Sequence, residues 1–121
     1  MDDTKYIESL LYSYNDWQTV GNKKQPYHIE IKRDDQFFYY FGANHSRDPK
    51  NFQYPKLKKY WNDFLKITHS CNAIVLVEGS VREVREDEKK AITEDSEAGL
   101  ITLLAHRANI PVDSPEPDRR A

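Results

Sequence analysis

The stretch NAIVLVEG, residues 72–79, constrains the fold more than any other part of the chain. Its apolar residues are continuous and mostly β-branched, and they end at Glu78 and Gly79. A strand with one wet face alternates polar and apolar residues, whereas a continuous apolar run that follows a helix is typical of a parallel strand covered on both faces. We therefore expect a buried parallel strand at 73–77.

Helical spacing of apolar residues is found on both sides of this strand. Residues 55–67 have one apolar face, and residues 95–108 have another, with Asp95 or Ser96 as the helix N-cap. The charge run between the strand and the second helix, SVREVREDEKKAITED, favours a solvated loop or an exposed helix edge. The apolar stripes are Leu57, Trp61, Phe64 and Leu65 in the first helix and Ala98, Ile101, Leu104, Ala105 and Ala108 in the second.

Upstream, YHIEIKR and QFFYYF flank Asp34 and Asp35, which predicts a β-hairpin with a tight turn. The first strand has one polar face, on which we expect His28 to be solvated. The second strand is apolar on both faces and is predicted to be buried. Residues 4–18 carry apolar side chains at helical spacing, which predicts an amphipathic helix.

This order of elements predicts an α/β fold. An N-terminal helix and a β-hairpin lead into a small, mostly parallel sheet with right-handed βαβ crossovers, the last strand starting at residues 110–112. We divide the chain into an N-terminal helical segment at 1–25, an α/β core at 26–113 and a polar tail at 114–121.

Composition limits the function classes. The chain has 121 residues and a formal net charge of −2, and its basic clusters are short, so we expect neither nucleic-acid binding nor a membrane partner. Cys71 is the single cysteine, which excludes an intramolecular disulfide and favours a reducing compartment. The N-terminus has no signal-peptide pattern and no apolar run has the length of a membrane span. We therefore expect a cytoplasmic protein.

Polar residues follow each expected strand where it ends. The carboxyl ends of parallel strands lie at one rim of a sheet, where ligands of open α/β folds bind. Glu97, in the first turn of the helix from 95, is expected near the same rim. The strand-end candidates are Gly42, His45 and Asp48 after 36–41, Glu78 and Gly79 after 73–77, and Glu116 after the last strand.

Each candidate also has an ordinary explanation. His45 and Asp48 fit loop polarity, and Glu97 fits a helix end that favours a carboxylate. Glu78 is harder to explain in this way, because it closes a strongly apolar strand, where an unpaired carboxylate would cost several kcal/mol. A neutral imidazole beside carboxylates can act as a general base or bind a divalent metal, and His45 and Glu78 are the candidate metal ligands. A partner such as Glu78 or Asp48 would have to orient the imidazole.

The motifs FGANHSRDP, AIVLVEGS and EDSEAGLITLLAHRANIPVDSPEPD resemble the opening part of the Tiki/TraB superfamily, which includes erythromycin-esterase-like and ChaN-like haem-uptake proteins. In this resemblance Gly42 and His45 match a Gly-x-x-His motif, and Glu78 a glutamate that ends the second strand. Glu97 matches the glutamate of a Gly-Glu-Ala-Gly helix start, in which Ser96 takes the place of the first glycine. Glu116 matches the glutamate of a later glutamate-proline pair.

The resemblance implies an α/β fold with a His/Glu crevice, and ester or amide hydrolysis that depends on a metal in some members. His45, Glu78 and Glu97 would then be the catalytic residues, with Gly42, Asp48, Gly79 and Glu116 supporting them and a small molecule or peptide as substrate. Family domains extend beyond the third strand, so we expect a truncated domain. The alternatives are an inactive fragment and a binding or assembly module that forms homo-oligomers through an open sheet edge.

Overall fold

The computed structural model describes residues 25–68 and 72–116, and every structural statement below concerns these residues. The predicted hairpin is confirmed: β1 (Tyr27–Arg33) pairs antiparallel with β2 (Gln36–Gly42), and Ile31 lies opposite Phe38. Its turn contains Asp34, whose φ of 54° lies in the left-handed region that Asp tolerates better than most residues. The predicted N-terminal helix at 4–18 and Cys71 lie outside the described residues.

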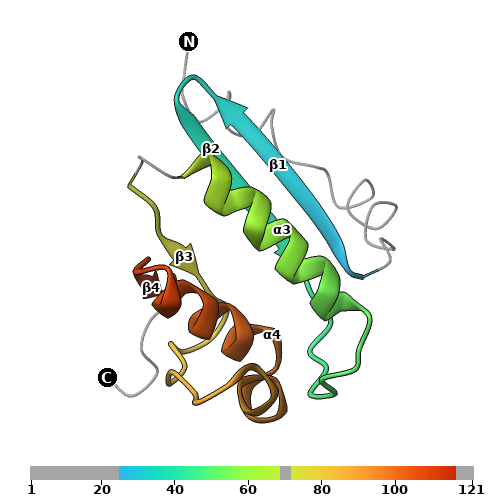
Figure 1. Ribbon diagram of the computed structural model, residues 1–121. Helices are drawn as coiled ribbons and strands as arrows, with labels where there is room; N and C mark the ends of the chain where they lie inside the picture. The colour runs from blue at the N-terminus through green and yellow to red at the C-terminus, as the bar shows by residue number, and fades with distance from the viewer. Residues whose placement is uncertain (1–24, 69–71, 117–121) are drawn as a thin grey trace.

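The helix predicted at 55–67 is present as α3 (Gln53–Ile67), and it packs on one face of the hairpin (Figure 1). Aromatic rings form most of this contact. The Tyr60 ring centroid lies 4.8 Å from that of His28, 5.0 Å from that of Tyr39 and 6.0 Å from that of Phe41. His28 is exposed, as predicted, but its ring also covers Tyr60.

The prediction that β2 is buried on both faces is wrong for the described residues. Phe38 is 52% exposed and Tyr40 is 44% exposed, because α3 covers only the opposite face of the hairpin. The strand is apolar on both faces, but burial requires a second covering layer, and the described residues supply only one.

The predicted parallel strand is present but short. β3 (Val75–Leu76) pairs in parallel with β4 (Val112–Asp113), and α4 (Glu88–Arg107) connects them. Backbone bonds from Val75 N to Pro111 O, 2.9 Å, and from Val77 N to Asp113 O, 3.0 Å, hold the pair. The predicted segment 73–77 too is covered on one side only, since Leu76 of β3 is 56% exposed and Val77, directly after the strand, is 5% exposed.

The second helix begins earlier than predicted. Asp87 caps α4 by accepting a hydrogen bond from Lys90 N at 2.7 Å, so of the two alternatives for the charge run, a loop or an exposed helix edge, its second half is helical. Ala91 and Ile92 are buried and anchor this first part of the helix to the core. The helix is interrupted at Ser96, near the predicted start, where φ is 56° and ψ is −143°.

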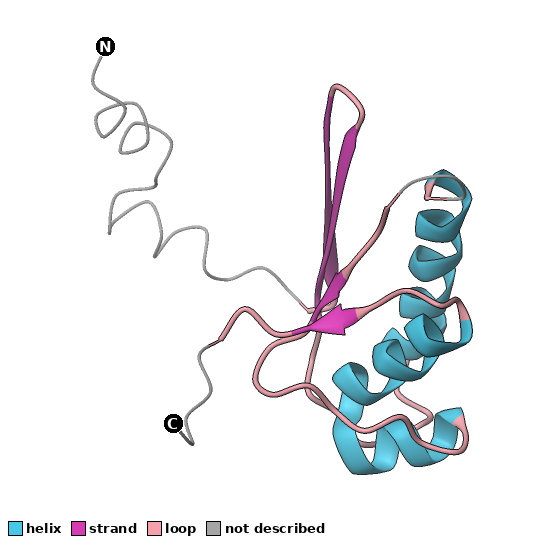
Figure 2. Ribbon diagram, turned by 90° about the vertical axis from the view of Figure 1, so that its left-hand side faces the viewer, coloured by secondary structure: helices cyan, strands magenta, loops and turns pink. Residues whose placement is uncertain are grey.

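The described residues therefore form a small α/β structure with two two-stranded sheets, one antiparallel and one parallel, rather than one mostly parallel sheet. The four strands lie in one layer and both helices lie on the same side of it (Figure 2). The core lies between the helices and the strands. Its buried residues are Tyr54, Leu57, Trp61, Ile92, Leu100, Leu104 and Ala105. No helix within the described ranges has the length and apolarity that a membrane span requires.

Candidate functional site

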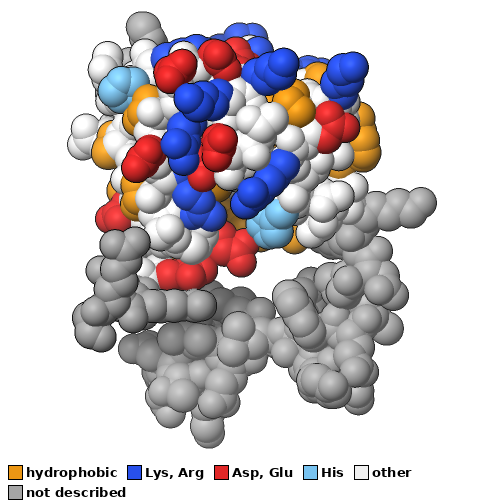
Figure 3. Space-filling model, turned by 90° about the horizontal axis from the view of Figure 1, so that it is seen from below, with side chains coloured by type: hydrophobic (Ala, Val, Ile, Leu, Met, Phe, Trp, Pro, Cys, Tyr) orange, Lys and Arg blue, Asp and Glu red, His pale blue; other side chains and the backbone are white. Residues whose placement is uncertain are grey.

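A polar pocket lies where the chain leaves β2, β3 and β4 and where α4 bends. Its volume is about 1010 Å³. The loops after the strands contribute His45, Gly79 and Ser114, and the bend in α4 contributes Ser96. Its carboxylates are Glu78, Glu94, Asp95, Glu97, Asp113 and Glu116, and its cations are Arg47 and Arg82. Seen from below, acidic and basic side chains lie close to one another on the surface (Figure 3).

His45 lies between two of these carboxylates. Its Nδ1 is 2.5 Å from Glu97 Oε1, and its Nε2 is 3.7 Å from Glu78 Oε2. The Glu97 side chain is 16% exposed, whereas that of His45 is 67% exposed and that of Glu78 is 77% exposed. The contact with Glu97 places the proton of a neutral imidazole on Nδ1, and the lone pair of Nε2 is then on the side of the ring that faces the exposed Glu78 carboxylate.

Glu97 is the least exposed of the three residues in this cluster. Its second oxygen, Oε2, is inaccessible and has no hydrogen-bond partner among the described residues. A buried carboxylate oxygen without a partner is unfavourable, because the carboxylate loses its hydration there. Among the described residues, the contact between Glu97 Oε1 and His45 Nδ1 is therefore the main interaction that offsets the lost hydration of this carboxylate.

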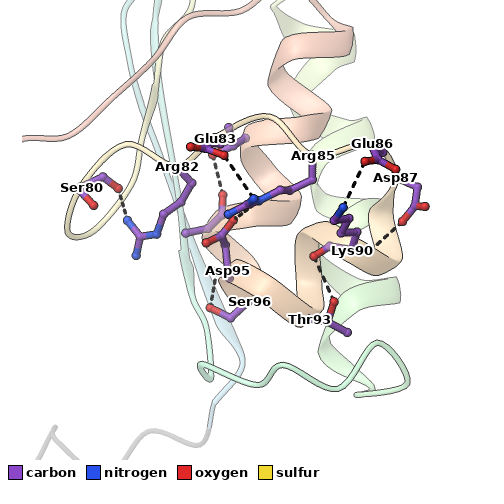
Figure 4. A network of polar contacts seen from close by, with 12 residues as sticks. Ser80, Arg82, Glu83, Arg85, Glu86, Asp87, Lys90, Thr93, Asp95 and Ser96 are labelled. Atoms are coloured by element: carbon purple, nitrogen blue, oxygen red, sulfur yellow. Dashed lines mark hydrogen bonds and ion pairs between the residues drawn. The ribbon is translucent and has the colours of Figure 1, made fainter.

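The bend in α4 determines where Glu97 lies. The helix residues on either side of Ser96 approach one another closely: a Cβ built on Gly99 would lie 2.3 Å from the carbonyl oxygen of Ala91, so only glycine fits there. Arg85, from the preceding loop, donates to Asp95 Oδ2 at 2.9 Å and ties that loop to the bend (Figure 4). This bond raises the pKa of the Arg85 guanidinium further.

The loop that carries His45 is held by the first turn of α3, which the sequence analysis did not identify as part of the site. Gln53 is fully buried, and its amide accepts from Asn44 N at 2.9 Å and donates to Asn44 O at 2.6 Å. Tyr54 donates its hydroxyl to the carbonyl oxygen of Ser46. These bonds fix the backbone on both sides of His45.

A sequence signal for Gln53 exists. It stands one helical turn before Leu57 and two turns before Trp61, so a polar amide occupies the line of the apolar stripe. A buried polar side chain at such a position needs partners, and here the partners are the backbone groups of Asn44.

The Tyr54 phenol is also close enough to the site for the Glu97 carboxylate to affect its pKa. Burial, with a smaller contribution from the nearby Glu97 carboxylate, raises the pKa of the Tyr54 phenol to about 12. Tyr54 is 3% exposed, so its hydroxyl stays protonated and keeps its bond to the loop over the whole range in which most proteins are stable.

The predicted supporting residues divide into two groups. Gly79 and Glu116 line the pocket with the His45 cluster. Gly79 has a φ of 78°, which glycine adopts readily, and its carbonyl oxygen accepts from Ser114 Oγ. Gly42 and Asp48 do not line it.

Gly42 and Asp48 have structural roles instead. A Cβ on Gly42 would lie 2.3 Å from the Tyr27 ring, so this glycine makes room for an aromatic side chain and not for a ligand. Asp48 Oδ1 accepts from Lys50 N at 2.9 Å and stabilises a turn. The partner that orients His45 is therefore Glu97, with Glu78 further away, and not Asp48.

A metal centre is not formed by the described residues alone, because they contain no group of three or more His, Cys, Asp or Glu side chains arranged to hold an ion. Protein metal sites typically have three or four protein ligands. The predicted ligands His45 and Glu78 supply two, and Glu97 is engaged at the other ring nitrogen of His45.

Comparison of the chain with protein-family models, with curated proteins and with solved structures gave no match. The Tiki/TraB resemblance stays a prediction that rests on the sequence motifs.

Proposed function

We propose that the pocket is a hydrolytic site in which His45, held by Glu97, activates a water molecule for attack on an ester or amide. The observation that supports this proposal is the contact of 2.5 Å between His45 Nδ1 and Glu97 Oε1, with Glu78 Oε2 3.7 Å from the other ring nitrogen. A carboxylate that holds an imidazole by Nδ1 and leaves Nε2 unprotonated is the arrangement that a histidine general base needs.

The chemistry follows from this arrangement. The Nε2 lone pair of His45 takes a proton from water while the water oxygen bonds to the carbonyl carbon of the substrate. The imidazolium then returns this proton to the leaving alkoxide or amine as the carbon–oxygen or carbon–nitrogen bond breaks. Glu97 stabilises the imidazolium between these steps.

Glu78 has a different role. Its carboxylate is exposed and faces the same side of the imidazole as Nε2. The Glu78 carboxylate can accept a hydrogen bond from the second O–H of the water and so orient the water oxygen toward the substrate. Arg82 donates to the backbone carbonyl of Glu78 at 3.0 Å and supports this part of the loop.

The proposed substrate is a small molecule or a peptide that carries an ester or amide group. This class is supported by the resemblance of the three motifs to Tiki/TraB proteins. A divalent ion bound by His45 and Glu78 would supply a bound water with a pKa of about 7, but the described residues alone do not make such a centre.

Hydrolysis of a panel of chromogenic esters and amides tests the proposal, with His45→Ala and Glu97→Gln as the variants. We expect both to lower kcat/KM by roughly 10²- to 10⁴-fold, the usual contribution of general acid–base catalysis. His106→Ala is the matched control, since His106 is exposed in the last turn of α4 and does not line the pocket. An added chelator tests the metal prediction.

Two outcomes would contradict the proposal. One is the absence of hydrolysis over the whole panel, with and without added divalent ions. The other is activity that falls as much in His106→Ala as in His45→Ala.

An assembly module is the second candidate function. In the described residues each strand of the hairpin sheet pairs on one side only, which leaves the outer edges of β1 and β2 open to strand addition. Sedimentation velocity over a range of concentrations tests this candidate: self-association in a chain without hydrolytic activity would favour it, and a monomer at all concentrations would count against it.

A further inference from the structure

The β1–β2 hairpin has an apolar face that points away from α3. We call it the outer face and define it as Ile29, Ile31, Phe38 and Tyr40. The strand register pairs Ile29 with Tyr40 and Ile31 with Phe38, so the four side chains form one contiguous group on the same side of the sheet. The residues that contact Tyr60 of α3, His28 and Tyr39 among them, alternate with these and lie on the other face.

The outer face is accessible in the described part of the chain. Ile31 is 54% exposed and Phe38 is 52% exposed. The segment around β3 has a similar pattern, because Ile74 is 53% exposed and Leu76 is 56% exposed, whereas Val77, directly after the strand, is buried. Figure 2 shows the reason: both helices lie on one side of the strand layer.

An exposed apolar face of this kind is expected to be covered by another segment of the chain or by another molecule. Burial of a large apolar side chain stabilises a protein by about 1.5–3 kcal/mol, and soluble proteins rarely leave contiguous apolar patches of more than a few hundred Å² uncovered. Both strands also have high β-branched and aromatic content on this face, which is typical of strands packed on both sides.

We propose that the occupant is the N-terminal segment of the same chain, residues 4–18, which covers the outer face as an amphipathic helix. Its sequence has one apolar stripe with acidic and polar residues around it. The stripe is Tyr6, Ile7, Leu10, Leu11, Tyr14 and Trp17. The hairpin would then lie between two helical layers, as the apolar run of β2 predicts.

The dimensions match. A helix over residues 4–18 would be about 22 Å long at 1.5 Å per residue, and seven-residue β1 is about 23 Å long at 3.3–3.4 Å per residue. A helix is about 10–12 Å wide, and two strands at a spacing of about 4.8 Å present a surface of similar width. Residues 19–26, extended, reach about 26 Å, enough for the chain to return along the hairpin.

A second copy of the chain is the competing occupant. Two outer faces packed on each other would leave the apolar stripe of residues 4–18 without a partner in both copies. The tethered segment also has an effective concentration of roughly millimolar for a short linker, well above ordinary protein concentrations. The intramolecular contact is therefore favoured.

Trp17 reports on this contact in the full chain. The chain has two tryptophans, so Trp61→Phe leaves Trp17 as the single emitter. We expect Trp17 to be protected from acrylamide in this background, and the quenching constant to rise several-fold when Ile31→Asp or Phe38→Asp is added. Val84→Asp is the matched control, since Val84 is 46% exposed and lies on the loop between β3 and α4 rather than on the outer face.

A second measurement needs no change at Trp61. Chymotrypsin cleavage at the tyrosines and leucines of residues 6–14 should accelerate several-fold in Ile31→Asp relative to both the parent chain and Val84→Asp. Circular dichroism of each variant shows that the fold is retained.

Three results would overturn the proposal. The first is a Trp17 that is quenched freely in the parent background. The second is protection that Ile31→Asp and Phe38→Asp leave unchanged. The third is protection that disappears on dilution together with a dimer in sedimentation velocity, which would assign the outer face to a second copy.

Discussion

Substitution of Ser96 by glycine tests how the fold positions the Glu97 carboxylate. Ser96 has a φ of 56° and a ψ of −143°, a region that glycine occupies easily and other residues rarely do. Glu97 follows directly, so this backbone conformation sets the direction from which the carboxylate approaches His45. The motif that the chain resembles has glycine at this position.

The expected magnitude comes from comparison of glycine with alanine. A non-glycine residue in this region costs about 1–3 kcal/mol, whereas glycine loses about 0.5–1 kcal/mol more conformational entropy on folding than alanine. Both variants lose the bond from Ser96 Oγ to Asp95 O, 2.6 Å, so this term cancels. Ser96→Gly should therefore be more stable than Ser96→Ala by roughly 1–2 kcal/mol.

Urea unfolding of the two variants measures the difference, and Lys89 provides the control. Lys89 is exposed within the regular first part of α4, so there Lys89→Ala should be more stable than Lys89→Gly by about 0.5–1 kcal/mol. The reasoning is refuted if Ser96→Ala equals or exceeds Ser96→Gly in stability, because position 96 would then behave as an ordinary helical residue.

Three further predictions concern the supports of the site. Gln53→Leu removes both bonds to the Asn44 backbone, and we expect a loss of roughly 1–3 kcal/mol in urea unfolding together with weaker hydrolysis, while unchanged stability would contradict the role of this amide. Gly99→Ala should destabilise the chain by about 1–3 kcal/mol, because its Cβ would lie 2.3 Å from Ala91 O; a gain in stability, as at an ordinary helical glycine, would show that the bend relaxes. The pKa of Tyr54 is raised to about 12 from an ordinary 10.0, so the phenol of the unfolded chain ionises at a lower pH than that of the folded chain. The contribution of Tyr54 to the free energy of unfolding should therefore be complete below pH 10, and roughly 2–3 kcal/mol of it should be lost as the pH rises from 10 to about 12. In Tyr54→Phe, the free energy of unfolding should fall less than in the parent chain between pH 10 and about 12. An identical fall in both chains would show that Tyr54 is not its cause.

The elements with strong local periodicity were predictable from the sequence. The hairpin was marked by an alternating run and an apolar run on either side of Asp34 and Asp35, and α3 by its apolar stripe. The start of α4 was not predicted, because the charges of residues 80–95 concealed the cap at Asp87 and the two anchoring residues Ala91 and Ile92. Charge density describes only the solvent side of a helix, and two buried residues are enough to hold the other side.

The degree of strand burial could not be predicted from the strands themselves. Apolar residues on both faces of β2 indicate that both faces favour burial, but which layer covers each face depends on other parts of the chain. The described residues cover only the face toward α3.

The candidate site was predictable in part. The rule that strand ends share one rim correctly placed Glu78 near His45, and the expected helix start correctly placed Glu97 near it. It misplaced Asp48 and Gly42, because a loop residue near a strand end can serve the loop or a neighbouring ring instead. The contact at 2.5 Å also depends on the bend at Ser96, whose conformation is a tertiary feature with no periodic signal.

Nitrogen-15 NMR of the His45 side chain tests the proposed His45–Glu97 pair most directly, with His45→Ala for assignment. We expect the neutral imidazole to carry its proton on Nδ1, because Nδ1 lies 2.5 Å from Glu97 Oε1, and we expect Glu97→Gln to change this tautomer or mix it with the other. His45 with its proton on Nε2, or a tautomer that Glu97→Gln leaves unchanged, would show that Glu97 does not hold the imidazole and would contradict the proposed general base.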